Sequence, residues 1–168
     1  MTLNLKAVPD EKIKKFLMAH YQIPDYQADV CVAFAQGNVG KAIQLAASDD
    51  FNELKESALS LIKRLDDIDL YEMGEAIKQI SDYKLQVQDY FDLITVWYRD
   101  VLYMKATNDV NGLIFKDEVY DIKKQASKHS YHGIETIIEA LDKAKLRINA
   151  NVNFDLVIEL LLMTIKEN

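Results

Sequence analysis

The chain has 168 residues, of which 49% are apolar and 28% charged, and its formal net charge is −7. This length allows one or two domains, and the apolar content excludes a disordered chain because it suffices for a core. The acidic balance argues against direct binding of nucleic acid, which usually requires a basic face. No apolar run reaches the roughly 18 residues needed to span a membrane, so no membrane association is expected.

The N-terminal part predicts three short helices. Both prolines, Pro9 and Pro24, lie within the first 24 residues, and no proline follows. A long proline-free chain with apolar residues at a spacing of 3.6 is expected to be all-α. The helices are expected at about 10–20, 25–36 and 39–48. The segment "SDDF" then interrupts the pattern and predicts a domain boundary, with a small domain over 1–49 and a second over 50–168.

The second domain predicts a bundle of about five to six helices. They are expected at about 51–65, 70–83, 85–107, 116–127, 131–149 and 154–166. The longest helix carries an apolar stripe that includes Trp97, which we expect to be buried against the final helix. The final helix, FDLVIELLLMTI, is apolar nearly all the way round, which predicts a central position contacted on several sides.

The stretch AFAQGNVGKAIQLA resembles a phosphate-binding loop only superficially. A Walker loop needs a further glycine, a Ser or Thr after the lysine, and a strand before it. Here Ala35 and Ala42 occupy the glycine and hydroxyl positions, and the preceding segment has a helical pattern. A helix–turn–helix corner fits better, with Gly37 ending one helix in a left-handed conformation and Asn38 capping the next. A glycine at Gly40 would then allow another helix to approach closely.

The sequence offers little that could carry out catalysis. His20, His129 and His132 lack the spacing of metal ligands, and we expect surface positions for His129 and His132. The three aspartates of "DDIDL" lack the glycine and distal glutamate of a calcium loop, so they are expected to cap a helix. We therefore predict no catalytic residue, cofactor or metal. The lone Cys31 lies in an apolar helix, which indicates a buried structural thiol in a reducing cytoplasm.

Three segments together resemble the C-terminal part of delta-prime subunits of the bacterial DNA polymerase III clamp loader. LKAVPDEKIKKFL resembles a AAA+ core strand that enters the small lid domain, and AFAQGNVGKAIQLA resembles the third-helix motif of that lid. WYRDVLYMK, followed much later by NANVNFDLVIELLLMTI, resembles the collar domain. The resemblance implies a three-helix AAA+ lid over 1–49, with residues 1–8 as the remnant of an absent AAA+ core, and a helical collar over 50–168.

The resemblance also implies a non-catalytic role in assembly. ATPase subunits of such loaders place an arginine of the lid motif on the nucleotide. Here the matching stretch Gly37–Asn38–Val39–Gly40–Lys41 has Gly40 at that position, so the lid motif is degenerate. Lys41 points about 100° round the helix from it. The expected partners are the gamma/tau and delta subunits, with DNA contacted only indirectly.

Three other functions stay open at this point, of which a stand-alone enzyme is the weakest. Gly40 argues against a gamma/tau-type ATPase fragment, because such a subunit would carry an arginine at this position. An unrelated helical regulatory or DNA-binding module is opposed by the acidic charge, because basic residues such as Lys123, Lys124 and Lys128 more often form a solvated helix face.

Surface contacts with other subunits are expected on the longest helix. The candidates are Tyr98, Arg99 and Tyr103, and all three side chains are expected to be exposed. Aromatic side chains and the guanidinium group of arginine are typical of residues that dominate interface energies. Arg99 and Asp100 point about 100° apart, so at least one of them should be available to a neighbour.

Overall fold

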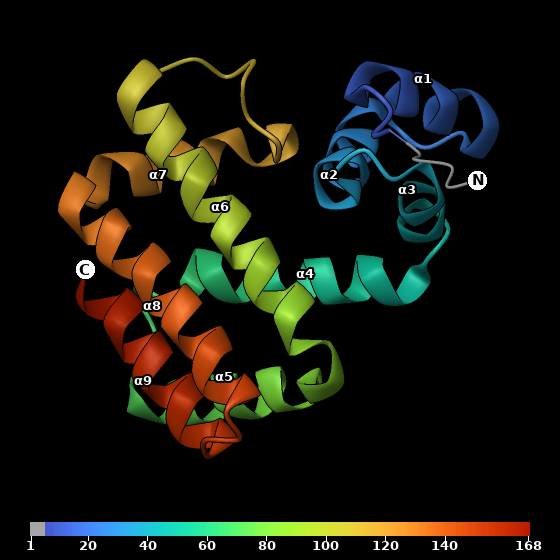
Figure 1. Cartoon of the computed structure of the whole chain (residues 1–168). Coiled ribbons are helices and arrows are strands. Elements are labelled where there is room, and N and C mark those ends of the chain that lie inside the picture. Colours follow the sequence, from blue (N-terminus) through green and yellow to red (C-terminus); the bar gives the residue numbers. More distant parts are fainter. Residues whose placement is uncertain (1–5) are drawn as a thin grey trace. The chain divides into compact units, whose positions relative to one another are not determined.

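The computed structural model describes residues 6–168, and within that range every regular element is a helix (Figure 1). The all-α fold predicted from the sequence is therefore confirmed. Of the core remnant expected at residues 1–8, residues 1–5 lie outside the described residues. Over the described range, no helix is both long and apolar enough to cross a membrane.

The chain divides into two compact units. Unit 1 comprises the described residues up to Asn52 together with Ile114–Asp117, and unit 2 comprises Glu53–Leu113 and Glu118–Asn168. The sequence did not predict that the short segment Ile114–Asp117 belongs with the N-terminal unit. The assignment of the units to a lid and a collar stays a prediction, which we take up below.

Unit 1 is built from three short helices, α1 (Asp10–Tyr21), α2 (Asp25–Ala35) and α3 (Val39–Ala46). They enclose a small core in which Cys31 is buried, as its apolar setting predicted. Small side chains from α2 and α3 fill much of this core, so the three helices pack closely. Its buried members are Ile13, Leu17, Ala28, Cys31, Val32, Ala35, Ala42 and Ala46.

A network of ion pairs explains why the segment Ile114–Asp117 joins unit 1. The ammonium group of Lys14 on α1 lies 2.8 Å from Asp25 and 2.7 Å from Asp29 on α2. The other carboxylate oxygen of Asp29 accepts from Lys116 at 2.7 Å. One carboxylate thus holds two cations that are far apart in the chain.

Unit 2 contains most of the regular structure. Its helices are α4 (Asp49–Arg64, which begins before the division), α5 (Leu70–Ser81), α6 (Val87–Thr107), α7 (Val119–Lys128), α8 (Tyr131–Asn149) and α9 (Phe154–Glu167). The 3-10 helix Lys84–Gln86 precedes α6, and the 3-10 helix Lys116–Glu118, whose first two residues belong to unit 1, precedes α7. The long helix α6 packs against α7 and α8, and α9 packs against α8 and α5.

Large aromatic side chains from α6 form the centre of unit 2. Trp97, Tyr90, Tyr98 and Phe91 are fully buried. The burial predicted for Trp97 is thus confirmed, and its indole N–H donates to Gln125 of α7 at 2.7 Å. Gln125 in turn donates to the carbonyl of Ile62 on α4 at 3.0 Å. This buried chain of hydrogen bonds ties three helices together.

Three helices of unit 2 begin at capping side chains, and the cap in the acidic turn before α5 was predicted from the sequence. Asp69 and Glu72 form a reciprocal capping box at the start of α5, with distances of 2.8 and 2.9 Å. Ser130 and Asn153 accept from backbone N–H groups in the first turns of α8 and α9. These bonds satisfy donors that a helix start leaves without a partner, so they help to fix where each helix begins.

The final helix differs from its prediction. One face of α9 is buried, but Leu156, Leu160 and Met163 on the other face are 59%, 47% and 42% exposed. α9 does contact two helices, α8 and α5, but the predicted central position was wrong because these helices leave one face of α9 uncovered. Its apolar outer face is consequently part of the surface of unit 2.

Gly74 gives a simple test of the packing of α5. It lies within the helix, and a Cβ atom added there would meet nothing within 4 Å. Gly74→Ala is expected to stabilise unit 2 by about 0.5–1 kcal/mol, because alanine restricts the unfolded chain and favours the helix. Chemical denaturation followed by circular dichroism measures this change. A loss of stability would show that a neighbour occupies the space beside Gly74.

Candidate functional site

The corner between α2 and α3 takes the form that its sequence predicted. Gly37 has φ = +81°, the left-handed region that favours glycine, as predicted, but the residue that ends α2 is Gln36, which is itself left-handed at φ = 49°. The side-chain oxygen of Asn38 accepts from the backbone N–H of Lys41 at 3.0 Å and thereby caps α3. The corner also binds the incoming chain, since Val8 donates its backbone N–H to the carbonyl of Gly37 at 3.1 Å.

The reason for the second glycine was predicted wrongly. A Cβ atom at Gly40 would meet only the side chain of Asn38, at 3.4 Å, so no other helix approaches this position. The close approach is at Gly37, where a Cβ atom would lie 2.6 Å from the Cβ of Ala7. The neighbour is the extended segment before α1, which the helical pattern could not reveal.

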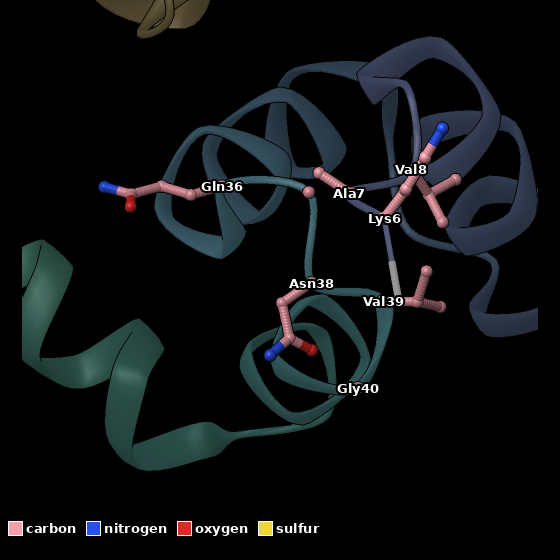
Figure 2. Close-up of a pocket in the computed structure, with 8 residues that line it drawn as sticks. Lys6, Ala7, Val8, Gln36, Asn38, Val39 and Gly40 are labelled. Carbon is pink, nitrogen blue, oxygen red and sulfur yellow. The ribbon is translucent and has the colours of Figure 1, made fainter. Parts of the chain in front are cut away.

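A surface pocket of about 440 Å³ opens over this corner (Figure 2). It is lined by Lys6, Ala7, Val8 and the five residues Gln36 to Gly40. Figure 2 shows that the side chain of Gln36 points away from the other labelled side chains. The side-chain oxygen of Asn38 already accepts from the first turn of α3, where a Walker loop would leave the N–H groups open to phosphate. The arrangement is that of a capped corner.

The three residues expected to contact other subunits differ in exposure. Arg99 is exposed on α6, and within the described residues its guanidinium group forms no hydrogen bond or ion pair. Tyr103 is half-buried, donates to Asp109 at 3.2 Å and covers Gly112. It therefore braces the loop that follows α6.

Tyr98 was expected at the surface, and this expectation was wrong. The side chain is fully buried. Because α6 packs against both α7 and α8, more of its circumference is buried than a single apolar stripe along the helix would indicate. Burial, together with the negative charge of Asp66, raises the pKa of the Tyr98 hydroxyl well above its ordinary value. In the free chain, Arg99 is consequently the most exposed of the three contact candidates.

His129 was also expected at the surface, yet it is 2% exposed. Its ring meets Tyr98 edge-on, with 5.9 Å between the ring centres. Among the described residues, neither ring nitrogen of His129 nor the hydroxyl of Tyr98 has a hydrogen-bond partner. The closest charge is the carboxylate of Asp66, 3.8 Å from Nε2.

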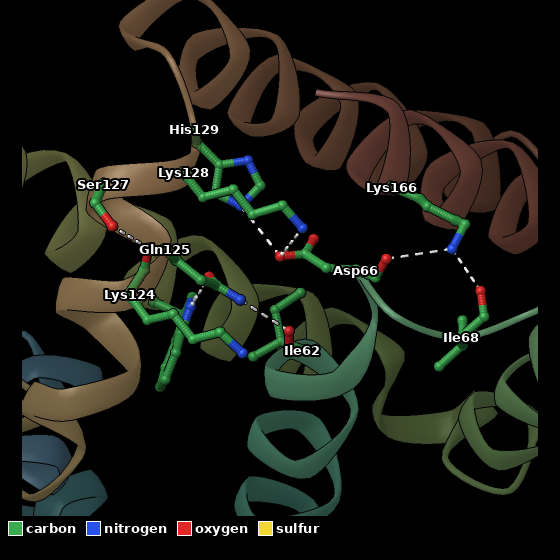
Figure 3. Close-up of polar contacts among 10 residues, drawn as sticks. Ile62, Asp66, Ile68, Lys124, Gln125, Ser127, Lys128, His129 and Lys166 are labelled. Atoms are coloured by element: carbon green, nitrogen blue, oxygen red, sulfur yellow. Dashed lines mark hydrogen bonds and ion pairs between the residues drawn. The ribbon is translucent and has the colours of Figure 1, made fainter.

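Asp66 joins the end of α4 to two later helices (Figure 3). Its carboxylate lies 2.9 Å from the ammonium group of Lys128 at the end of α7. The ammonium group of Lys166 on α9 donates to the backbone carbonyls of Asp66 and Ile68. Both basic residues near helix C-termini thus make contacts within unit 2, and Lys128 does so while its side chain stays 51% exposed.

No group of His, Cys, Asp and Glu side chains in the described part of the chain could hold a metal ion. The pocket at the corner and the exposed Arg99 on α6 are the candidate sites for contact with other macromolecules.

Comparison with known proteins identifies the family. The family described as "DNA polymerase III, delta subunit, C terminal" matches residues 52–167, which is nearly all of unit 2. The chain belongs to this family. It is also 26% identical over 172 residues to the DNA polymerase III subunit delta' of Bacillus subtilis (strain 168). That match covers 98% of the chain and 49% of the relative, so the chain spans about half the length of that protein. No solved structure matches.

These matches confirm the resemblance to delta-prime subunits that was found in the sequence. The match to the Bacillus subtilis protein covers both units, whereas the family match covers unit 2.

Proposed function

We propose that the chain is a non-catalytic assembly region of a clamp-loader subunit of the delta-prime type, which helps to load the sliding clamp during DNA replication. The observation that carries this proposal is the family match over residues 52–167. Unit 1 would act as the AAA+ lid and unit 2 as the collar that packs with other subunits. A protein with this role works in the cytoplasm.

The structure of the corner supports a lid that makes no contact with nucleotide. Gly40, at the position where the resemblance places an arginine, has no side chain that could reach a phosphate. The following Lys41 lies about 100° further round α3, and its backbone N–H is bonded to Asn38. These features weigh against the alternative of a gamma/tau-type ATPase. The family match weighs against an unrelated DNA-binding module.

The partners in this proposal are the gamma/tau and delta subunits of the same loader, and DNA is contacted only through the assembled complex. Unit 2 would supply protein contacts through exposed side chains outside its core. Arg99 is one such side chain, because it is exposed on α6 and its donors are not engaged within the described residues. Arginine is among the residues that most often dominate interface energies.

Arg99→Ala is expected to weaken assembly with the cognate gamma/tau and delta subunits by about 1–3 kcal/mol. The melting temperature should stay nearly unchanged, because the side chain is exposed. Isothermal titration calorimetry measures the affinity and differential scanning calorimetry the melt. Arg64→Ala removes the same exposed group from α4 and serves as the control. If both variants assemble alike, or if Arg99→Ala melts early, Arg99 is not an interface residue.

A further inference from the structure

Helices α8 and α9 form a groove on the surface of unit 2. The two helices lie side by side, in orange and red in Figure 1. The groove encloses about 170 Å³, and small side chains at Ala140 and Ala144 form part of its lining. Small residues leave room for the backbone and side chains of another helix to come close. On α9, the exposed Leu160 lines the groove together with Val157, Leu161 and Thr164.

An apolar ridge runs along the groove. Leu156, Leu160 and Met163 follow the spacing i, i+4, i+7, so they lie on one face of α9. All three are more than 40% exposed, although the face opposite them is fully packed. Single exposed apolar residues are ordinary, but a continuous row beside a groove is typical of an interaction site.

The α8 side of the same groove is basic. Lys143 and Arg147 both line it, and their spacing of four residues places them on one face of α8. Lys143 meets Glu139 at 3.2 Å, but both side chains are about 60% exposed, so this pair holds the lysine weakly. Among the described residues, no ion pair involves Arg147. These cations stand out in a chain whose net charge is −7.

We propose that the α8/α9 groove binds an amphipathic helix of another clamp-loader subunit, with acidic residues along the edge that faces α8. The proposal rests on the proposed function and names the chemistry of the partner. A helix is the natural occupant, because the ridge and the small residues can interdigitate with its side chains. Asp or Glu on its edge would pair with Lys143 and Arg147.

The charge distribution argues against a second copy of this chain as the occupant. A two-fold symmetric contact brings the same patch of both copies together. If the two-fold axis crosses the groove, Lys143 and Arg147 of the two copies face each other and like charges oppose the contact. If it runs along the groove, they face the apolar ridge of the other copy, where Leu156, Leu160 and Met163 offer no carboxylate. A different chain with acidic residues has no such penalty.

Two substitutions test the two parts of the groove separately. Leu160→Gln removes apolar contact, so the complex with the cognate gamma/tau or delta subunit should dissociate about tenfold faster. Arg147→Gln removes a rim charge, so the complex should form more slowly and depend less on salt. Leu146→Gln is the matched control, since Leu146 is 68% exposed on α8 and outside the groove. Surface plasmon resonance at several salt concentrations measures these rates, and thermal melts check folding.

The outcomes separate this proposal from the proposed function. If the complex forms and both groove variants behave like Leu146→Gln, the groove is not the contact and the proposal is wrong, while the assembly role stands. If the unaltered chain binds no loader subunit, the proposed function itself fails. If the chain alone forms a dimer that Leu160→Gln abolishes, the occupant is a second copy and the proposal is overturned.

Discussion

Trp97→Ala is expected to lower the free energy of unfolding of unit 2 by about 3–5 kcal/mol. The indole is fully buried, so its removal leaves a cavity that the packed helices around it can fill only partly. It also leaves the side-chain oxygen of Gln125 without the N–H donor that lies 2.7 Å away. A buried acceptor that loses its partner adds its own penalty to that of the cavity.

Trp97→Phe separates these two contributions. Phenylalanine keeps much of the aromatic volume but cannot donate to Gln125, so we expect a loss of about 1–3 kcal/mol. Urea denaturation, followed by far-ultraviolet circular dichroism because the only tryptophan is removed, measures both variants. A loss below about 1 kcal/mol for Trp97→Ala would contradict the central packing of α6.

Gly37→Ala is expected to destabilise unit 1 by about 1–3 kcal/mol. A positive φ is unfavourable for alanine, and its Cβ would lie 2.6 Å from the Cβ and 3.3 Å from the Cα of Ala7. The segment before α1 would have to move away. That movement would break the hydrogen bond from Val8 to the carbonyl of Gly37.

Gly40→Ala is the matched control, because it adds the same methyl group three residues later. Gly40 lies in the first turn of α3, and its Cβ would meet only Asn38 at 3.4 Å. We expect this variant to be neutral or slightly stabilising. Hydrogen exchange of the α2 and α3 amides reports on unit 1 directly. Equal protection in the two variants would contradict the role assigned to Gly37.

Local structure could be read closely from the sequence. The predicted helix at 131–149 coincides with α8 (Tyr131–Asn149), since Ser130 is a good cap before an amphipathic pattern. The left-handed conformation of Gly37 and the cap at Asn38 were predicted from the preferences of glycine and asparagine at helix ends. Such features depend on residues close in sequence, and their preferences are strong.

Tertiary surroundings were harder to predict. A helical period gives the direction of each side chain but not the number of neighbours that cover it. Tyr98 was therefore predicted to be exposed, although α6 packs against both α7 and α8 and the side chain is buried. The pairing of Lys116 with Asp29 joins positions 87 residues apart, and no local pattern signals it. For Leu156 and Leu160, the apolar sequence of α9 predicted burial, whereas the structure leaves them at the surface.

His129 illustrates the same limit within a buried cluster. Its position at the junction between α7 and α8 suggested exposure, because helix ends usually lie at the surface. The end of α4 covers it instead, through Asp66 and the pairs that Asp66 forms with Lys128 and Lys166. An acidic turn and a basic helix end are visible in the sequence, but their meeting depends on how α4, α7 and α9 pack.

The proposed function requires the chain to assemble with the other subunits of a clamp loader. Sedimentation velocity of the chain, alone and mixed with its cognate gamma/tau and delta subunits, tests this most directly. We predict that the mixture contains a faster-sedimenting species that includes the chain, and that Arg99→Ala or Leu160→Gln reduces its amount. If the folded chain sediments independently of every loader subunit at micromolar concentrations, the account is contradicted.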